Sequence, residues 1–297
     1  MADLVLERAL HQALAAGGGA PPPRLGEALA YAVFPGGGRV RPRLCLEVAR
    51  ACGTAGELAY AAACSIELLH CASLVHDDLP CFDEAAVRRG KPSVHRVFGE
   101  AMAVLVGDGL MVQSFYTLAR AVARRPDVSP YPVLTLLEAA GPRAGLVAGQ
   151  AWELEKQVDL AAYHRAKTAS LFEAAAALGA SANGQATTPF VALGRAFGMA
   201  YQLADDVADA LADSATLGKP TGKDRELSRP TAMRDDAASA DAAIERMIRA
   251  GKAATDAVPA CPGEADLRRF VDAVFDSLVA RCRRATPENH ARTKLSA

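Results

Sequence analysis

The sequence predicts an all-α protein built as a bundle of helices, and three observations support this fold class. Of the 297 residues, 51% are hydrophobic but only 5% aromatic, and alanine recurs along the whole chain, which favours helices packed closely through small side chains. Apolar residues recur at helical spacing over long runs, most clearly within 55–75. The sequence also lacks the alternation of half-buried strands. Length alone allows one large domain or two.

In the first half of the chain, apolar periodicity predicts helices over 4–14, 25–33, 44–51, 55–75 and 100–121. Glycines and prolines within 17–23 end the first of these helices. Residues 34–43 form a glycine-rich turn that leads into a basic segment. This segment is interpreted equally well as a flexible connector and as a loop that approaches an anion. Residues 79–94 contain two prolines and a glycine and are expected to be irregular.

The second half is expected to continue with helices over 133–147, 163–180, 189–212, 237–258 and 264–281. Gly141 and Pro142 interrupt the first of these, and Gly149 opens a short segment that runs to Trp152. Residues 217–224 resemble a phosphate-binding loop only superficially, because they do not fit GxxxxGK[ST] and follow a helix rather than a strand. The last two helices carry no chemical motif and are interpreted as structural amphipathic helices.

Charge and cysteine content exclude several classes of protein. The formal net charge of -1 argues against general nucleic-acid binding, which needs a clustered basic surface. The seven cysteines form no CxxC pair, so free and largely buried thiols are expected and a zinc site is not favoured. Residues 1–16 mix charged and apolar residues unlike a signal or transit peptide, and charged residues interrupt the best apolar run. A soluble, cytoplasmic protein with no membrane span is therefore expected.

The first chemical feature is a group of three carboxylates, Asp77, Asp78 and Asp83, that follows the apolar run 55–75. Arg88 and Arg89 come within one short loop of it. Such a cluster is usually a solvated helix end. Carboxylates nevertheless suit Mg²⁺, which is commonly shared with substrate phosphates, and guanidinium groups suit the remaining phosphate oxygens. His70 lies two helical turns before Asp77 on the same face, which makes it a candidate ligand.

A second acidic cluster, Asp205, Asp206 and Asp209, lies within the helix predicted over 189–212. Asp205 and Asp209 share one face, and Gln202 faces the same way. Like charges at this spacing repel each other by a few tenths of a kcal/mol, so a compensating cation is expected. Two acidic clusters with basic residues around them indicate a cavity between facing helices, where divalent ions would hold a diphosphate.

The chain resembles the trans-isoprenyl diphosphate synthases, most closely the bacterial geranylgeranyl diphosphate synthases of carotenoid and bacteriochlorophyll pathways. The resemblance extends from about Leu25 to Cys261. Any one of its motifs is weak evidence, but the whole set in this order is highly specific. They are GGGRVRP at 36–42, DDLPCFD at 77–83, RRGKPSVH at 88–95, GQ at 149–150, KT at 167–168, Gln202 with DDVAD at 205–209, and the loop 218–224.

This resemblance implies an isoprenoid-synthase-type bundle around a deep central cavity. It implies one polyprenyl synthase domain over 1–297, with 1–24 as a peripheral helix and linker and 283–297 as a polar tail. It also implies Mg²⁺, with three ions per active site, isopentenyl and allylic diphosphates as substrates, and a homodimer.

The resemblance also implies roles for single residues. Those implied to ligate Mg²⁺ are Asp77, Asp83 and Asp205, and those implied to complete or orient the metal site are Asp78, Asp206 and Asp209. Those implied to contact the allylic diphosphate are Arg88, Lys167 and Lys219, and those implied to hold isopentenyl diphosphate are Arg41, His70 and Arg89. Arg229, where a lysine is more common, joins the substrate-binding set. The residues implied to face the developing allylic cation are Lys167, Thr168 and Gln202.

The implied reaction is the head-to-tail condensation of isopentenyl diphosphate with allylic diphosphates. Short-chain members of the family carry an aromatic residue just before the first acidic motif, whereas this chain has Ala72 and Ser73. Small residues leave room for a longer chain, so geranylgeranyl diphosphate is expected, with a shorter farnesyl product as the alternative.

Gly38 is the main departure from the family, because it stands where a lysine usually contacts isopentenyl diphosphate. Arg39 or Arg43 is a candidate to replace that lysine; the alternative is a lower affinity for isopentenyl diphosphate. Gly38 also leaves open a non-catalytic subunit of a prenyl synthase, although two complete aspartate clusters argue against it. Terpene cyclases and head-to-head synthases lack a second diphosphate site, so Arg41, His70 and Arg89 argue against them.

Overall fold

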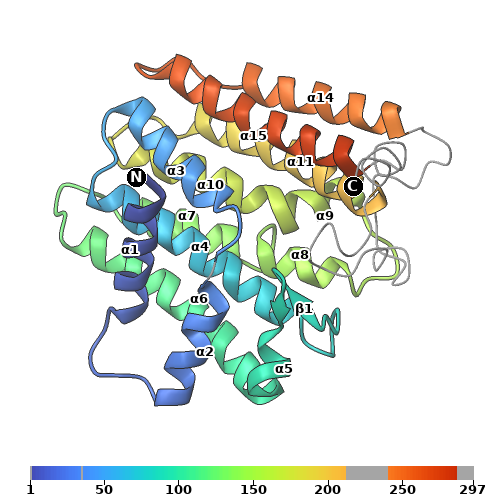
Figure 1. The fold of residues 1–297 in the computed structure, drawn as a ribbon. Coiled ribbons are helices and arrows are strands. Elements are labelled where there is room, and N and C mark those ends of the chain that lie inside the picture. Colours follow the sequence, from blue (N-terminus) through green and yellow to red (C-terminus); the bar gives the residue numbers. More distant parts are fainter. Residues whose placement is uncertain (1, 35, 212–239, 286–297) are drawn as a thin grey trace.

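The computed structural model describes residues 2–34, 36–211 and 240–285, and helices dominate this part of the chain (Figure 1). The expected all-α fold is confirmed. The helices of the first half are α1 (Ala2–Ala15), α2 (Pro23–Val33), α3 (Val40–Cys52), α4 (Glu57–Asp77), α5 (Val94–Phe98) and α6 (Glu100–Ala123). Those that follow are α7 (Tyr131–Ala140), α8 (Leu146–Trp152), α9 (Leu160–His164), η1 (Arg165–Ala169), α10 (Ser170–Ser181), α11 (Thr188–Leu211), α14 (Ala240–Asp256) and α15 (Glu264–Ala285).

Helix α4 runs through the centre of the bundle and packs against α6, α3 and α10. It is buried on nearly every side, and alanine, cysteine and serine side chains alternate with leucine and isoleucine along it. A helix that is apolar all round is expected to be buried. Its carboxyl end, at Asp77, is therefore fixed inside the molecule.

Helices α10, α11, α14 and α15 form the other side of the bundle (Figure 1). Helix α11 packs against α10, α14 and α15. Phe172 of α10, Phe197 of α11 and Phe275 of α15 join these helices through neighbouring ring contacts. The second acidic cluster lies on α11, so this packing sets its position relative to α4.

The basic segment after the glycine-rich turn belongs to a helix, which differs from the expected start at residue 44. Helix α3 begins at Val40, and Pro42 is tolerated there because the first turn needs no amide donor. Arg39 precedes the helix in the left-handed conformation, with φ of 48°. Arg41 therefore projects from a helix rather than from a flexible turn.

The segment expected to be irregular contains a short hairpin. Strands β1 (Val87–Arg88) and β2 (Lys91–Pro92) pair antiparallel, with Arg88 opposite Lys91. The two residues between them, Arg89 and Gly90, have φ of 53° and 75°. Two consecutive left-handed residues are typical of a tight type I′ turn. The hairpin holds Arg88 and Arg89 in fixed positions beside the end of α4.

Two of the expected helices near the middle of the chain differ in detail from expectation. The helix expected over 133–147 is two helices, α7 and α8, since Gly141 and Pro142 separate them completely. The helix expected over 163–180 extends from 160 to 181 and contains the wider π-helical turn η1. Such turns frequently occur at functional sites.

Helices α4 and α6 are each long and apolar enough to cross a membrane, judged by length and composition alone. The most apolar stretch of α4 is 72% buried inside the protein, as in the core helix of a globular fold, whereas that of α6 is 33% buried. All seven cysteines are free thiols, and Cys81 is the exposed one.

Candidate active site

A cavity of about 360 Å³ lies between α4, α8, η1 and α11, with the loop before α3 at its edge. It gathers most of the residues that the sequence suggested as functional. Those that line it are Arg41, His70, Ser73, Asp77, Asp83, Arg88, Arg89, Lys167, Thr168, Gln202, Asp205, Asp206 and Asp209. Lys219 and Arg229 lie outside the described residues. Residues more than 100 positions apart thus share one site.

Asp77, at the last residue of α4, faces the cavity although little of it is exposed. Its Oδ1 atom accepts a hydrogen bond of 2.9 Å from Nε2 of Gln150 in α8. The same amide donates to the backbone carbonyl of Ser73 at 3.1 Å. Gln150 therefore orients the first carboxylate. The backbone amide of Asp83 donates to the Asp77 carbonyl at 2.9 Å, which turns the chain so that Asp83 lines the same cavity.

Asp78 points elsewhere. It is buried beside a smaller pocket behind the cavity, where Arg88 donates to its Oδ1 from Nε at 2.9 Å. Burial raises the pKa of Asp78, and the hydrogen bond from Arg88 opposes that shift. Asp78 therefore holds Arg88 at the edge of the cavity rather than facing the cavity with Asp77.

The second acidic cluster faces the cavity from α11. Gln202 links two of its neighbours, because it accepts a hydrogen bond from the Thr168 hydroxyl and donates from Nε2 to Asp206 at 2.7 Å. Asp205 is more open, and its Oδ1 atom lies 3.5 Å from Nη2 of Arg281 in α15. The polar groups of η1 and α11 therefore form one connected wall.

Lys167 lies in the π-helical turn and is held by Glu153. The lysine ammonium and the Tyr163 hydroxyl both donate to Oε1 of Glu153, the latter at 2.5 Å. Burial opposes the charge of Lys167, but the carboxylates of Asp77 and Glu153 outweigh this and raise its pKa. Lys167 therefore carries its positive charge into the cavity throughout the physiological pH range.

Two glycines allow helices to approach the π-helical turn closely. A methyl group on Gly149 of α8 would overlap the backbone of Lys167. A Cβ atom on Gly198 of α11 would lie 2.6 Å from the Cα atom of Ala169. Helices α8 and α11 can therefore contact η1 backbone to backbone, which brings Gln150 and Gln202 to either side of Lys167 and Thr168.

Arg41 and His70 form a pair on the opposite side of the cavity. Nη1 of Arg41 lies 3.4 Å from Nε2 of His70, and its guanidinium carbon lies 4.7 Å from the centre of the Phe172 ring. Burial and the neighbouring arginines, Arg41 first among them, lower the pKa of His70 well below its ordinary value. The imidazole is therefore neutral, and its Nε2 accepts from Arg41.

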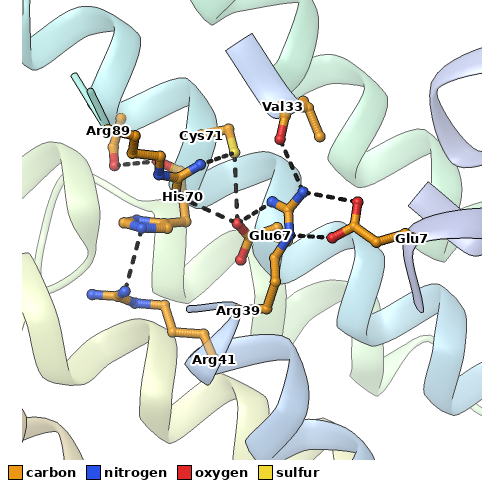
Figure 2. A network of polar contacts seen from close by, with 9 residues as sticks. Glu7, Val33, Arg39, Arg41, Glu67, His70, Cys71 and Arg89 are labelled. Atoms are coloured by element: carbon orange, nitrogen blue, oxygen red, sulfur yellow. Dashed lines mark hydrogen bonds and ion pairs between the residues drawn. The ribbon is translucent and has the colours of Figure 1, made fainter. Parts of the chain in front are cut away.

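A network of charged side chains, in which Arg39 and Glu67 are buried, lies behind this pair (Figure 2). Arg39 donates from Nε to Glu7 at 2.9 Å, from Nη1 to Glu67 at 2.6 Å and from Nη2 to the Val33 carbonyl at 2.9 Å. Oε1 of Glu67 also lies 3.6 Å from Nη2 of Arg89. Glu67 thus joins the immobilised Arg39 to a cavity-facing arginine.

The acidic residues fit divalent metal ions that are shared with a substrate. In the described part of the chain, no three acidic, histidine or cysteine side chains come together closely enough to hold an ion by themselves. Asp77, Asp83, Asp205 and Asp209 instead line one cavity from two sides. Mg²⁺ typically keeps several waters and takes one or two carboxylates together with substrate phosphates. The carboxylates and the neighbouring cations suit that arrangement.

Sequence reasoning missed several residues that line or support the cavity: Glu67, Glu153, Tyr163, Tyr201 and Arg281. Glu67 was detectable in part, since it is the one carboxylate within the apolar run 58–75. Nothing in the sequence indicated Arg281, because its helix carries no motif and enters the site only through tertiary packing.

The cavity combines facing carboxylates, fixed cations and an all-helical shell, and the chain belongs to the Polyprenyl synthetase family, whose sequence model matches residues 22–264. It is 48% identical over 281 residues to a geranylgeranyl diphosphate synthase from Cereibacter sphaeroides, covering 93% of this chain and 97% of the relative. It is 46% identical over 271 residues to the enzyme of that name from Rhodobacter capsulatus, covering 91% and 93%.

Solved structures agree with this assignment. A polyprenyl synthase from Caulobacter crescentus, crystallised with calcium and isoprenyl diphosphate, is similar with a TM-score of 0.77 and 25% identity, over 94% of each chain. A geranyltransferase from Helicobacter pylori, crystallised with magnesium and isoprenyl diphosphate, has a TM-score of 0.73 and 26% identity, over 92% of this chain and 96% of that one.

Proposed function

We propose that the protein joins isopentenyl diphosphate head-to-tail to an allylic diphosphate and makes geranylgeranyl diphosphate. The observation that carries this proposal is the single cavity in which carboxylates of α4 and α11 face each other among fixed cations. The names of the two bacterial relatives support the product. A farnesyl diphosphate synthase from Geobacillus stearothermophilus, 41% identical over 171 residues and covering 55% of this chain and 57% of its own, leaves the fifteen-carbon product as the alternative.

Asp77, Asp83, Asp205 and Asp209 would hold the divalent metal, with Asp206 orienting Gln202. Bound Mg²⁺ would neutralise charge on the departing diphosphate. Magnesium, rather than calcium, and a set of three ions per site are part of this proposal. Asp78 would act on the metal site indirectly, because it holds Arg88 in place.

The cations around the metal site would bind the allylic diphosphate. Lys167 and Arg88 each carry a positive charge into the cavity. A buried carboxylate holds each of them in place, Glu153 for Lys167 and Asp78 for Arg88. As the bond between the allylic carbon and the diphosphate oxygen breaks, the electron pair leaves with the diphosphate. Fixed positive charges are most effective at that moment, because they need no reorganisation in a site that excludes water. Lys219 and Arg229 are proposed to add to this binding.

The polar wall of Thr168 and Gln202 would face the allylic cation that forms. Their oxygen atoms present the negative ends of dipoles held in place by the Gln202 to Asp206 hydrogen bond. The isopentenyl double bond then attacks the cation, a carbon–carbon bond forms, and a proton leaves. The released diphosphate is the proposed acceptor of that proton, which makes a dedicated protein base unnecessary.

Arg41, His70 and Arg89 would hold the diphosphate of isopentenyl diphosphate on the opposite side of the cavity. The neutral imidazole of His70 orients Arg41 and leaves its remaining donors for phosphate oxygens. Arg89 is fixed at the hairpin turn. The reacting allylic carbon would thus lie between the two diphosphate sites.

The whole chain is proposed to act as one polyprenyl synthase domain in a soluble, cytoplasmic homodimer. The exposed apolar residues of α6, which include Leu105 at 54% and Val112 at 67% exposure, suit burial against a second copy.

Elongation with defined primers tests the proposal. Purified protein is incubated with Mg²⁺, labelled isopentenyl diphosphate and dimethylallyl, geranyl or farnesyl diphosphate in turn, and the products are sized by chromatography. We expect a twenty-carbon product from each primer. A fifteen-carbon limit would support the farnesyl alternative, and no elongation from any primer would indicate a non-catalytic subunit.

A further inference from the structure

Gly38 leaves the loop before α3 without a cation at the edge of the cavity. The residue is exposed and lines the cavity. A Cβ atom there would meet Cγ2 of Val40 at 3.5 Å and nothing closer, so the space for a side chain is open. Of the three residues proposed to hold isopentenyl diphosphate, Arg41 and Arg89 are then the charged ones, because the neutral His70 adds no charge.

Neither neighbouring arginine is placed to fill that gap. Arg39 is buried, and its guanidinium nitrogens are engaged by Glu7, Glu67 and a backbone carbonyl (Figure 2). Arg43 lies with its guanidinium carbon 5.6 Å from the centre of the Phe270 ring, on the side of α3 that faces α15. A positive charge at this position would therefore have to come from another element.

Arg281 of α15 lines the same cavity as Gly38. Its Nε atom is buried and has no hydrogen-bond partner among the described residues. Its Nη2 atom contacts Oδ1 of Asp205 at 3.5 Å, a long contact in which both side chains are about 40% exposed. A guanidinium group has five N–H donors, so the described residues use only a small part of its capacity.

The surroundings place Arg281 on the side of Arg41. Helix α15 packs against α3, which carries Arg41. Tyr201 lies near both arginines: Asp205 and burial raise the pKa of its hydroxyl to about 12, whereas the charges of Arg41 and Arg281 oppose the rise. The Tyr201 ring is also 5.7 Å from the Arg41 guanidinium carbon.

We propose that Arg281 binds the diphosphate of isopentenyl diphosphate and provides the positive charge that a lysine at position 38 would otherwise provide. This inference rests on the proposed function and assigns one more residue to its second substrate. A divalent cation bound by Asp205 would compete with Arg281 for that carboxylate. The guanidinium group would then be released to the phosphate oxygens.

Steady-state kinetics with four proteins test the inference: the wild type, Arg281→Gln, Gly38→Lys and the double variant. Hydrogen bonds to charged groups are worth about 1.5–3 kcal/mol, so Arg281→Gln is expected to raise the KM for isopentenyl diphosphate about tenfold or more. The KM for geranyl diphosphate should stay within about twofold, because Lys167 and Arg88 are intact. In the Gly38→Lys background the effect of Arg281→Gln should fall to about threefold or less, since the new lysine takes over the contact.

Arg284→Gln is the matched control, because it removes the same charge from an exposed position of the same helix. Its KM values should equal those of the wild type. Arg281→Lys, which keeps the charge without the planar fork, should fall between the wild type and Arg281→Gln. It also serves in place of Arg281→Gln if thermal unfolding shows that the glutamine variant does not fold.

Binding measured without turnover gives a second readout. Calorimetric titration of isopentenyl diphosphate with Mg²⁺ should show weaker binding to Arg281→Gln than to Arg284→Gln, and the difference should be smaller with EDTA, where Asp205 retains Arg281. An active wild type with unchanged KM and binding in Arg281→Gln would overturn the inference while leaving the proposed function intact. A rise confined to the KM for geranyl diphosphate would also overturn it, by placing Arg281 at the other diphosphate. An inactive wild type would instead refute the proposed function.

Discussion

Ala72 and Ser73 are neighbours on α4 but face different surroundings. Ser73 lines the cavity, and its hydroxyl donates to the His70 carbonyl at 2.9 Å. Ala72 is 1% exposed and belongs to the hydrophobic core, and it does not line the cavity. The sequence treated the two as equivalent determinants of product length, whereas the structure favours Ser73. The role of both positions remains a prediction.

Replacing Ser73 with Phe is expected to shorten the product. The ring would occupy space next to Asp77 that the growing chain needs, so farnesyl diphosphate should become the main product. Ala72→Tyr should shift the product in the same direction if its ring reaches the cavity. Chromatography of the products checks both, and Ser73→Ala, which removes the hydroxyl without filling space, should leave the distribution unchanged. A Ser73→Phe enzyme that still makes the twenty-carbon product would contradict the prediction.

The lowered pKa of His70 predicts a loss of stability in mild acid. The unfolded chain takes up a proton at this histidine near its ordinary pKa of about 6.5, whereas the folded protein takes it up only at lower pH. The unfolded state therefore binds more protons between these two values, and the free energy of unfolding falls as pH decreases through that window.

Urea unfolding of the metal-free protein at pH 7.5 and pH 5.5 measures this effect. His70→Gln, which cannot titrate, should lose less stability between the two values than the wild type does. Arg41→Gln should also reduce the loss, because it removes the nearest of the charges that oppose protonation. Equal losses in His70→Gln and the wild type would mean that other groups cause the acid sensitivity.

At the scale of elements, the π-helical turn η1 decides where Lys167 and Thr168 point. The sequence predicted an ordinary helix there, because a π turn differs from an α turn by one residue and leaves no clear pattern in the apolar spacing. The turn lies against α8 and α11 at glycines that allow close backbone contact. The π-helical conformation therefore occurs where neighbouring helices pack closely, and local helix propensity did not predict it.

Gly149→Ala is expected to reduce activity strongly. Its methyl group would overlap the backbone of Lys167, so α8 and η1 must separate, and kcat should fall about tenfold or more because small misplacements in an active site cost about that much. Gly109→Ala is the matched control within a helix, since its Cβ atom would meet Cδ2 of Leu29 at an ordinary 3.5 Å. The control should keep its activity and gain up to about 1 kcal/mol of stability. Full activity in Gly149→Ala would contradict the prediction.

Helix α1 also contributes more than the sequence suggested. It was expected to be peripheral, yet Glu7 reaches Arg39 and through it Glu67 and the cavity (Figure 2). The buried carboxylate of Glu67 would repel a diphosphate if it were unpaired. Arg39 pairs with Glu67, and Glu7 of α1 holds Arg39 in the position where it does so.

At the scale of the whole molecule, the exposed apolar residues of α6 predict a homodimer. Leu105, Val112 and Tyr116 lie at i, i+7 and i+11 and therefore share one face of the helix. Placing glutamate at both Leu105 and Val112 should convert a dimer into a monomer, because like charges would face each other across the interface. Light scattering after gel filtration measures the mass. Ile248→Glu, an exposed apolar residue of α14, should leave the mass unchanged. A wild-type monomer would refute the dimer itself.

The sequence by itself determined the helical fold class and the two acidic clusters, because helix periodicity and carboxylate spacing are local properties. It also indicated the family, through an ordered set of short motifs. The resemblance implied Asp77 as a metal ligand and Asp78 as a residue that completes or orients the site, but not which of the two faces the cavity. Adjacent residues on a helix point about 100° apart, and of these two Asp77 lines the cavity.

Only the tertiary structure decided how the site is completed. The sequence suggested Arg39 and Arg43 as substitutes for the lysine absent at Gly38, but the fold places Arg39 in a closed ionic network and Arg43 beside Phe270. It brings Arg281 into the cavity from a helix that carries no motif. The reason is physical: a charge acts on whatever lies within a few ångströms, and the packing of α15 against α3 and α11, rather than distance along the chain, fixes those neighbours.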